Sequence, residues 1–221
     1  ASVVFKDIRS VLILACGTSY YSGCVAKYWL ESVAHISCQV EVASEYRYRD
    51  SVPDPRTLVV TITQSGETAD TLASLRSAKQ QGLLTLGVVN VVGSTIARES
   101  DAGIYNHAGP EVAVASTKAF TTQLIALYLF TLHIGRVRGL LDQEACRQML
   151  GELISLPRKV EQCLELDEAI LFIAVYPGSI EGGVAVLDRT RFPQQLKGSD
   201  WELIQQFVEE HTQPMVKYVS V

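Results

Sequence analysis

Positive charge is scarce in this sequence, and long hydrophobic runs are missing. Nineteen Lys and Arg residues against 24 Asp and Glu residues give the 221-residue chain a net charge of −5. No basic run or stripe of the kind that binds nucleic acid occurs, so we expect no nucleic-acid partner. The longest strongly apolar segment, residues 124–134, contains His133 and is too short to span a bilayer. We therefore expect no membrane partner either.

The cysteines also exclude several classes of protein. The five of them form no CxxC pair and no metal-like cluster with the four histidines, so the sequence predicts no metal site. Neither does it predict a cofactor. Reduced thiols of this kind are typical of the cytosol, which predicts a cytoplasmic location. The N-terminus has no basic start and no long apolar region, so no signal peptide is expected. Because the chain begins with Ala1 instead of Met, we expect an excised fragment.

Hydrophobic patterning predicts an α/β fold. Apolar or alternating runs indicate five strands, and longer periodic segments between and after them indicate helices. Strands that alternate with helices form a parallel sheet covered on both faces. The expected strands are residues 11–15, 39–45, 58–63, 83–91 and 102–106, and the expected helices are residues 20–34, 68–81, 95–99, 116–138 and 142–166.

The segment from Thr63 to Thr68 (TQSGET) is the best candidate for a binding site. It follows a β-branched strand and precedes a helix, where free backbone N–H groups and the helix dipole favour an anion. Gly66 lets the backbone come close to a ligand, and the hydroxyls of Thr63, Ser65 and Thr68 can donate to phosphate oxygens. Alternatively, Ser65 only caps the helix. Taken alone, the segment fits both interpretations equally.

Two further polar loops favour the phosphate interpretation. Residues 16–19 (CGTS) repeat the order of strand, small hydroxyl residues and helix. Ligands of parallel sheets bind at the carboxyl ends of the strands, where both loops are expected. Ser116 and Lys118 begin a long helix, and a lysine in the first turn favours an anionic neighbour. The alternatives are that Ser116 is an N-cap and Lys118 is merely solvated. Cys16 is more plausibly a small packing residue than a nucleophile.

Four motifs together resemble one enzyme family, glucosamine-fructose-6-phosphate aminotransferase (isomerising), in the first of its sugar isomerase (SIS) domains. They occur in the family's order within residues 9–165. The resemblance implies a five-stranded parallel sheet flanked by helices, a flavodoxin-like sandwich that binds fructose 6-phosphate. The four motifs are residues 14–20 (LACGTSY), 43–49 (ASEYRYR), 64–72 (QSGETADTL) and 114–123 (VASTKAFTTQ).

The resemblance also implies which residues contact the ligand. The family's phosphate contacts fall on Ser19, Thr63, Gln64, Ser65 and Thr68. Its sugar contacts fall on Thr18, on the backbone of Val114 and on Ser116.

The complete family enzyme takes ammonia from a glutaminase domain and makes glucosamine 6-phosphate, with a lysine and a glutamate that move protons between C1 and C2. The resemblance does not extend to that machinery, so the catalytic residues are unknown and activity of this chain is left open. Residues 176–188 resemble the family's next segment faintly. In that alignment Ala185 replaces the lysine and Asp188 replaces the glutamate, while Glu181 is a second possible base.

Residues 167–221 are expected to form a separate, small β-β-α-β appendage to a domain of residues 1–166. Its expected elements are strands 169–176, 183–188 and 215–221 and a helix at 199–211. Its open sheet edge would need to pair, and a homodimer is expected, with the stretch around Tyr46 and Tyr48 exposed at the surface. Two alternatives to a fragment of the aminotransferase remain: a non-catalytic SIS module that senses a phosphosugar, and a structural or chimeric chain with a vestigial pocket.

Overall fold

The computed structural model describes residues 4–111, 116–164, 180–181 and 184–185. The chain divides into two compact units, Ala1–Leu150 and Gly151–Val221, and each is considered by itself. The first unit contains every candidate binding residue named above. The predicted domain boundary at residue 166 stays a prediction.

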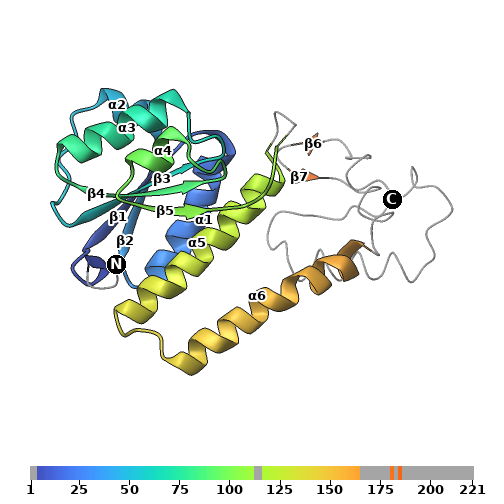
Figure 1. Cartoon of the computed structure of the whole chain (residues 1–221). Helices are drawn as coiled ribbons and strands as arrows, with labels where there is room; N and C mark the ends of the chain where they lie inside the picture. Colours follow the sequence, from blue (N-terminus) through green and yellow to red (C-terminus); the bar gives the residue numbers. More distant parts are fainter. Residues whose placement is uncertain (1–3, 112–115, 165–179, 182–183, 186–221) are drawn as a thin grey trace. The chain divides into compact units, whose positions relative to one another are not determined.

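Five parallel strands form the sheet of the first unit, which confirms the predicted fold class (Figure 1). They occur in the order β2-β1-β3-β4-β5. β1 pairs with both β2 and β3, so that Ala15 lies between Val42 and Ile62 at the carboxyl ends. The strand bounds are Ser10–Ala15 (β1), Ser37–Val42 (β2), Thr57–Thr63 (β3), Leu84–Val89 (β4) and Ala102–Tyr105 (β5).

Helices cover both faces of this sheet (Figure 1). On one face Ile13 and Ile62 pack in a core with Leu30 and Leu127, which lie on α1 and α5. On the other face Leu12, Leu14 and Val59 pack with residues from α2 and α3. Alternate residues of one strand thus serve opposite cores, as a doubly covered sheet requires. The helix bounds are Gly17–Ser32 (α1), Ala43–Tyr48 (α2), Ala69–Gln80 (α3), Thr95–Glu99 (α4) and Lys118–Val137 (α5). A short 3-10 helix, Val4–Lys6, precedes β1.

The structure corrects the prediction for the second strand. β2 ends at Val42, and the next residues form helix α2, where a strand up to residue 45 was expected. On α2, Tyr48 is exposed but Tyr46 is only 2% exposed and belongs to the second core. The expectation of an exposed pair of tyrosines was therefore wrong for Tyr46, because one face of the helix packs on the sheet.

The residues of helix α6, Gln143–Leu164, include the boundary between the two units, and the described residues of the second unit include two short strands. β6 (Ile180–Glu181) and β7 (Val184–Ala185) pair antiparallel. β7 lies within the strand predicted at residues 183–188, whereas β6 occupies residues for which no strand was predicted. The strands predicted at 169–176 and 215–221 and the helix predicted at 199–211 lie outside the described residues.

Candidate functional site

The loops after β1 and β3 lie side by side at the point where the strand order reverses. From β1 the chain crosses to β2 on one side and later enters β3 on the other side. At such a switch point the two following loops diverge and leave a crevice at the carboxyl ends of the strands. Thr18 and Ser19, which were predicted in a loop before the helix, lie in the first turn of α1, because that helix begins at Gly17 directly after Cys16. The loop after β3 contains residues 64–68. Both loops predicted to bind phosphate are therefore neighbours.

The loop after β3 is held by its own hydroxyl groups. Gly66 has a φ of 70°, a left-handed conformation that glycine adopts readily. Its backbone N–H donates to Thr63 Oγ1 at 3.3 Å, and Thr63 Oγ1 shares a hydrogen bond of 3.0 Å with Thr68 Oγ1. Thr63 and Thr68, the two ends of the candidate segment, are thus in direct contact.

Ser65 does not cap the following helix. The N-cap of α3 is Thr68, for which no side-chain capping hydrogen bond is found within the described loop and helix. Ser65 Oγ instead accepts a hydrogen bond of 3.1 Å from the backbone N–H of Glu67. The alternative interpretation of Ser65 as a helix cap is therefore wrong, and its hydroxyl proton can still be donated to a ligand.

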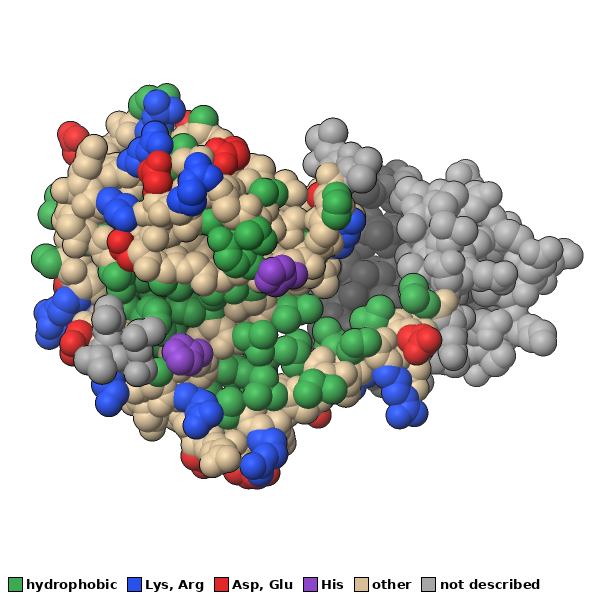
Figure 2. Space-filling model, in the orientation of Figure 1, with side chains coloured by type: hydrophobic (Ala, Val, Ile, Leu, Met, Phe, Trp, Pro, Cys, Tyr) green, Lys and Arg blue, Asp and Glu red, His purple; other side chains and the backbone are tan. Residues whose placement is uncertain are grey.

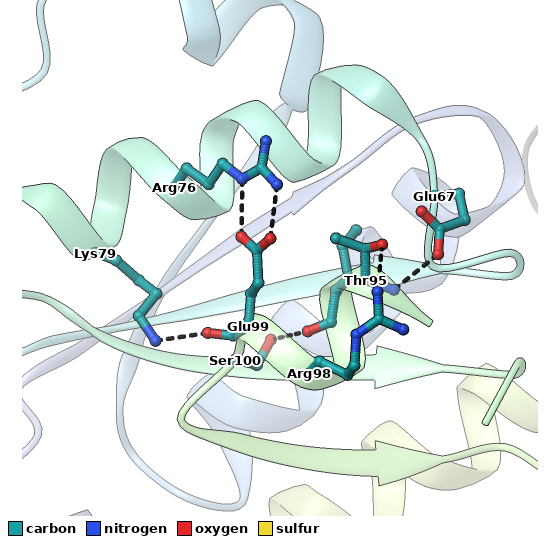
Figure 3. A network of polar contacts seen from close by, with 8 residues as sticks. Glu67, Arg76, Lys79, Thr95, Arg98, Glu99 and Ser100 are labelled. Atoms are coloured by element: carbon teal, nitrogen blue, oxygen red, sulfur yellow. Dashed lines mark hydrogen bonds and ion pairs between the residues drawn. The ribbon is translucent and has the colours of Figure 1, made fainter. Parts of the chain in front are cut away.

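A second segment, which runs from Asn90 after β4 to Ile96 in α4, holds this loop in place (Figure 3). The backbone N–H of Thr95 donates to Glu67 Oε1 at 2.7 Å, and that of Ile96 donates to the Gly66 carbonyl at 3.0 Å. The backbone N–H of Asn90 donates to the Gln64 carbonyl at 3.2 Å. Three residues of the loop, Gln64, Gly66 and Glu67, are thus fixed by partners about 26 to 30 positions further along the chain.

The C-terminal end of α4 and Asp101 beyond it are anchored to helix α3 by ion pairs, and Figure 3 shows the pair of Arg76 and Glu99. Arg76 holds Glu99 through two hydrogen bonds, at 2.8 and 2.6 Å. Lys79 Nζ lies 2.9 Å from the carboxylate of Asp101. These charged groups surround α4 and keep it beside the loop that precedes α3.

The first turn of α1 has one exposed and one buried hydroxyl side chain. Thr18 is exposed in the first turn of α1, whereas Ser19 is buried. Ser19 Oγ accepts a hydrogen bond of 3.0 Å from Gln123 Nε2 on α5. Cys16 is the N-cap residue of α1 and is partly buried.

The third candidate loop is described only in part, since Val114 lies outside the described residues. Ser116 is half-buried and precedes Thr117, which is the N-cap residue of α5, so the alternative of Ser116 as an N-cap is wrong. Lys118 is exposed in the first turn. The anionic group at this helix end is Glu111, whose carboxylate accepts a hydrogen bond of 3.1 Å from the backbone N–H of Ala119.

The electrostatics of the site favour hydrogen bonding over ion pairing. Residues 63–68 contain no cation, and their one carboxylate is Glu67. The hydrogen bond from the Thr95 backbone holds the pKa of the Glu67 carboxyl below its usual range, so it is ionised at neutral pH. Asp70, in the first turn of α3, is paired with Arg47 at 3.0 Å.

The hydroxyl groups of the candidate site can donate hydrogen bonds to an anion. A hydroxyl group has one proton and two acceptor positions. Ser19 and Ser65 each accept from an internal N–H group, which leaves their protons available. Thr63 and Thr68 use one proton between them and keep one. Together with the N-terminus of α3, these groups form a set of donors suited to a phosphate.

Metal-binding clusters and membrane-spanning helices are both missing from the described residues. Across the described ranges, no group of three or more His, Cys, Asp or Glu residues could hold a metal ion. No helix in that part of the chain has the length and apolar character needed to cross a membrane.

Sequence reasoning missed two residues that shape this site. Gln123 lies inside a motif that carried the resemblance, and a polar residue among the buried positions of a helix is a signal that could have found it. Glu67 contacts a backbone group 28 positions away, and no local pattern points to that contact.

Comparison with known proteins identifies the family to which the fold belongs. Residues 5–133, more than half of the chain, match the SIS domain family. A glutamine-fructose-6-phosphate aminotransferase (isomerizing) of Pseudomonas syringae pv. tomato is 54% identical over 175 residues, which are 79% of this chain and 29% of that protein. The corresponding protein of Bordetella pertussis is 51% identical over 197 residues, which are 89% of this chain and 32% of the relative.

A solved structure agrees as well. The C-terminal domain of glucosamine-fructose-6-phosphate aminotransferase from Francisella tularensis superimposes with a TM-score of 0.74 at 46% identity, over 76% of this chain and 48% of that one. The chain thus spans about a third of the length of the curated relatives it matches. The resemblance seen in the four motifs is confirmed, and the chain belongs to the SIS domain family.

Proposed function

We propose that this chain binds fructose 6-phosphate and glucosamine 6-phosphate. The observation that carries the proposal is that the hydroxyl-rich start of α1, directly after β1, and the hydroxyl-rich loop after β3 follow neighbouring strands at the switch point of the sheet. A phosphate there would receive hydrogen bonds from neutral donors and from the N-terminus of α3. The relatives named above are aminotransferases of fructose 6-phosphate, which supports this class of ligand.

The two parts of the ligand are assigned to different loops. The phosphate would be bound by Ser19, Thr63, Gln64, Ser65 and Thr68. The sugar would be bound by Thr18, by the backbone of Val114 and by Ser116. Because Ser116 immediately precedes the N-cap of α5, its place depends on how that helix is held.

Binding is proposed without catalysis by the isolated chain, as part of a longer aminotransferase of hexosamine synthesis. Ala185 occupies the position aligned with the family's lysine, and an alanine cannot transfer a proton. A coupled assay with fructose 6-phosphate should therefore show no isomerisation. Turnover in that assay would contradict the proposal and would point to Asp188 or Glu181 as the base. Ligand binding without turnover also fits the second candidate, a non-catalytic phosphosugar sensor.

Calorimetry with each sugar phosphate and with inorganic phosphate tests the binding proposal. We expect heat of binding with all three ligands, and a loss of affinity of about ten-fold or more for Ser65→Ala, since hydrogen bonds to charged groups are strong. The matched control is Ser32→Ala, which removes a hydroxyl from the other end of α1, where Ser32 Oγ only donates to the Tyr28 carbonyl. No heat with any ligand, or equal affinities for both variants, would refute the proposal.

A homodimer and a cytoplasmic location complete the proposal. β5 is an edge strand, and hydrophobic side chains gather between the sheet and α5 around a cavity of about 640 Å³ lined by Ile104, Leu129 and Phe130 among others (Figure 2). A second copy could pair with this edge. All five cysteines are free, which supports a reducing compartment.

Sedimentation equilibrium tests the dimer. Leu129→Glu should produce a monomer, whereas Val52→Glu, at a site that is 98% exposed, should leave the dimer intact. A native chain that sediments as a monomer would contradict this part of the proposal.

A further inference from the structure

Gln123 is a fully buried polar residue on a helix that otherwise buries mainly apolar side chains. Its exposed fraction is 0%, and Ala126, Leu127 and Phe130 follow it in the core. An amide group that is removed from water costs free energy unless its hydrogen bonds are made. The amide of Gln123 is therefore expected to have hydrogen-bond partners inside the protein, and these partners indicate its role.

Its partners are two serines in the first turns of α1. Gln123 Nε2 donates to Ser19 Oγ at 3.0 Å. Ser22 Oγ, which donates to the Ser19 carbonyl at 2.7 Å, lies 3.3 Å from Gln123 Oε1. Ser19 and Gln123 are 104 positions apart in the sequence. The amide thus connects the buried face of α5 to the N-terminal turns of α1.

We propose that Gln123 is a positioning residue of the phosphate site, which orients the Ser19 hydroxyl so that its proton is donated to the bound anion. This inference rests on the proposed function. The Gln123 N–H occupies one acceptor position of Ser19 Oγ, and a hydroxyl has a single proton. Because Ser19 Oγ accepts a hydrogen bond from Gln123, its proton points elsewhere and can be donated to the bound phosphate.

The same bond also holds α5 in register with α1. Ser116, the proposed sugar contact, immediately precedes the N-cap Thr117, and Gln123 lies less than two turns further along the helix. Trp29 on α1 and Tyr128 on α5 add an edge-to-face contact with ring centroids 5.2 Å apart. Gln123 therefore links the proposed phosphate loop of α1 to the helix that positions the sugar contact.

A double-mutant cycle on the full chain, titrated with inorganic phosphate and with fructose 6-phosphate, tests the proposal. Gln123→Met keeps the unbranched shape and removes both the carbonyl and the NH2 group of the amide. We expect it to weaken phosphate binding roughly 3- to 10-fold, the effect of one ordinary hydrogen bond. In a Ser19→Ala background the same change should add nothing, because the hydroxyl that Gln123 orients is already gone.

Gln123→Glu provides a second variant of nearly the same shape. An ionised carboxylate can only accept hydrogen bonds, so the Ser19 hydroxyl would donate to it instead of to the phosphate, and phosphate binding should fall further than with Met. The matched control is Thr131→Val on the same helix. Thr131 is also fully buried, but its hydroxyl only donates to the Leu127 carbonyl, so the phosphate affinity should be unchanged.

The outcomes separate the two proposals. If the native chain binds and Ser65→Ala weakens binding, but Gln123→Met and Gln123→Glu bind like the native chain, the role of Gln123 is refuted and the proposed function stands. A full additional loss from Gln123→Met in the Ser19→Ala background has the same meaning. If the native chain binds neither ligand, both proposals fail.

Discussion

The backbone N–H of Thr95 donates a 2.7 Å hydrogen bond to the carboxylate of Glu67, across 28 positions of sequence. Glu67 is the one acidic side chain of the candidate phosphate loop, and a carboxylate near an anion site opposes binding through its charge. The hydrogen bond gives this carboxylate a structural purpose: it fixes the loop against α4. The two effects have opposite signs and can be separated by substitution.

Glu67→Gln and Glu67→Ala should therefore differ in affinity for phosphate. Glutamine keeps an oxygen that can accept from Thr95 and removes the charge, so phosphate should bind at least as tightly as in the native chain. Alanine removes the acceptor as well, which releases the loop, so phosphate should bind less tightly than in the glutamine variant. Calorimetry with inorganic phosphate gives the ranking. Equal affinities for the two variants would show that the brace is not needed.

Gly66→Ala should be strongly destabilising. Gly66 has a φ of 70°, which costs about 1–2 kcal/mol for a residue with a Cβ atom. The added Cβ would also overlap the side chain of Ser94, and forced overlap in a packed site costs about 1–3 kcal/mol more. We therefore expect a total loss of roughly 2–5 kcal/mol in the free energy of unfolding, measured by urea titration.

The matched control for this substitution is Gly82→Ala. Gly82 has a φ of 74°, but no atom lies within 4 Å of a Cβ built there. The free energy of unfolding should therefore fall only by the cost of a left-handed φ at a residue with a Cβ atom, about 1–2 kcal/mol. The double variant Gly66→Ala with Ser94→Gly should regain the part that comes from overlap. Equal losses at Gly66 and Gly82 would contradict this account.

Much of the fold could be predicted from the sequence because the three central strands of the sheet, β1, β3 and β4, are buried on both faces. Such strands are continuous apolar runs, as at β1 and β3, and all five predicted strands of the first unit exist. Helix α2 was missed because Val40 and Val42 alternate like a strand, and nothing local marks the change to a helix at Ala43. Tyr46 becomes buried only because α2 packs on the sheet.

The candidate site was predictable to the level of its loops. Their hydroxyl residues and their place after strands are visible in the sequence, and their proposed roles stay predictions. The contacts that hold the loops were not visible. Gln123 looks like any helical glutamine until α5 packs on α1, and the partner of Glu67 is set by the order of strands in the sheet.

The cysteines should differ sharply in reactivity toward thiol reagents. Cys38 is 2% exposed, and burial raises the pKa of its thiol to about 12. Because the thiolate is the reactive form, Cys38 should stay unmodified in the folded chain, whereas the exposed Cys163 should react at once. Peptide mapping after brief labelling at pH 8 identifies the modified sites. Cys163→Ser should remove the rapid part of the labelling, and unfolding in urea should make Cys38 reactive.

Acid should loosen the segment around α4 through Asp101. Its carboxylate accepts from the Thr85 backbone at 2.9 Å, from the Thr85 hydroxyl at 2.7 Å and from Lys79 at 2.9 Å. Partial burial raises the pKa of Asp101, but these hydrogen bonds outweigh it and hold the pKa below its ordinary value of 3.8. The stabilisation is therefore complete above pH 3.8 and is lost as the pH falls through the lower pKa of the folded chain.

In the Asp101→Asn variant, the free energy of unfolding should therefore fall less steeply as the pH is lowered. Urea unfolding from pH 6 down to pH 2 measures the free energy at each pH, and the native chain should lose stability more steeply than the variant. Asp50→Asn, which changes an exposed carboxylate elsewhere, serves as the control and should keep the native slope. Parallel curves for the native chain and Asp101→Asn would mean that Asp101 titrates alike in the folded and unfolded states, because only a difference in pKa between the two states makes stability depend on pH.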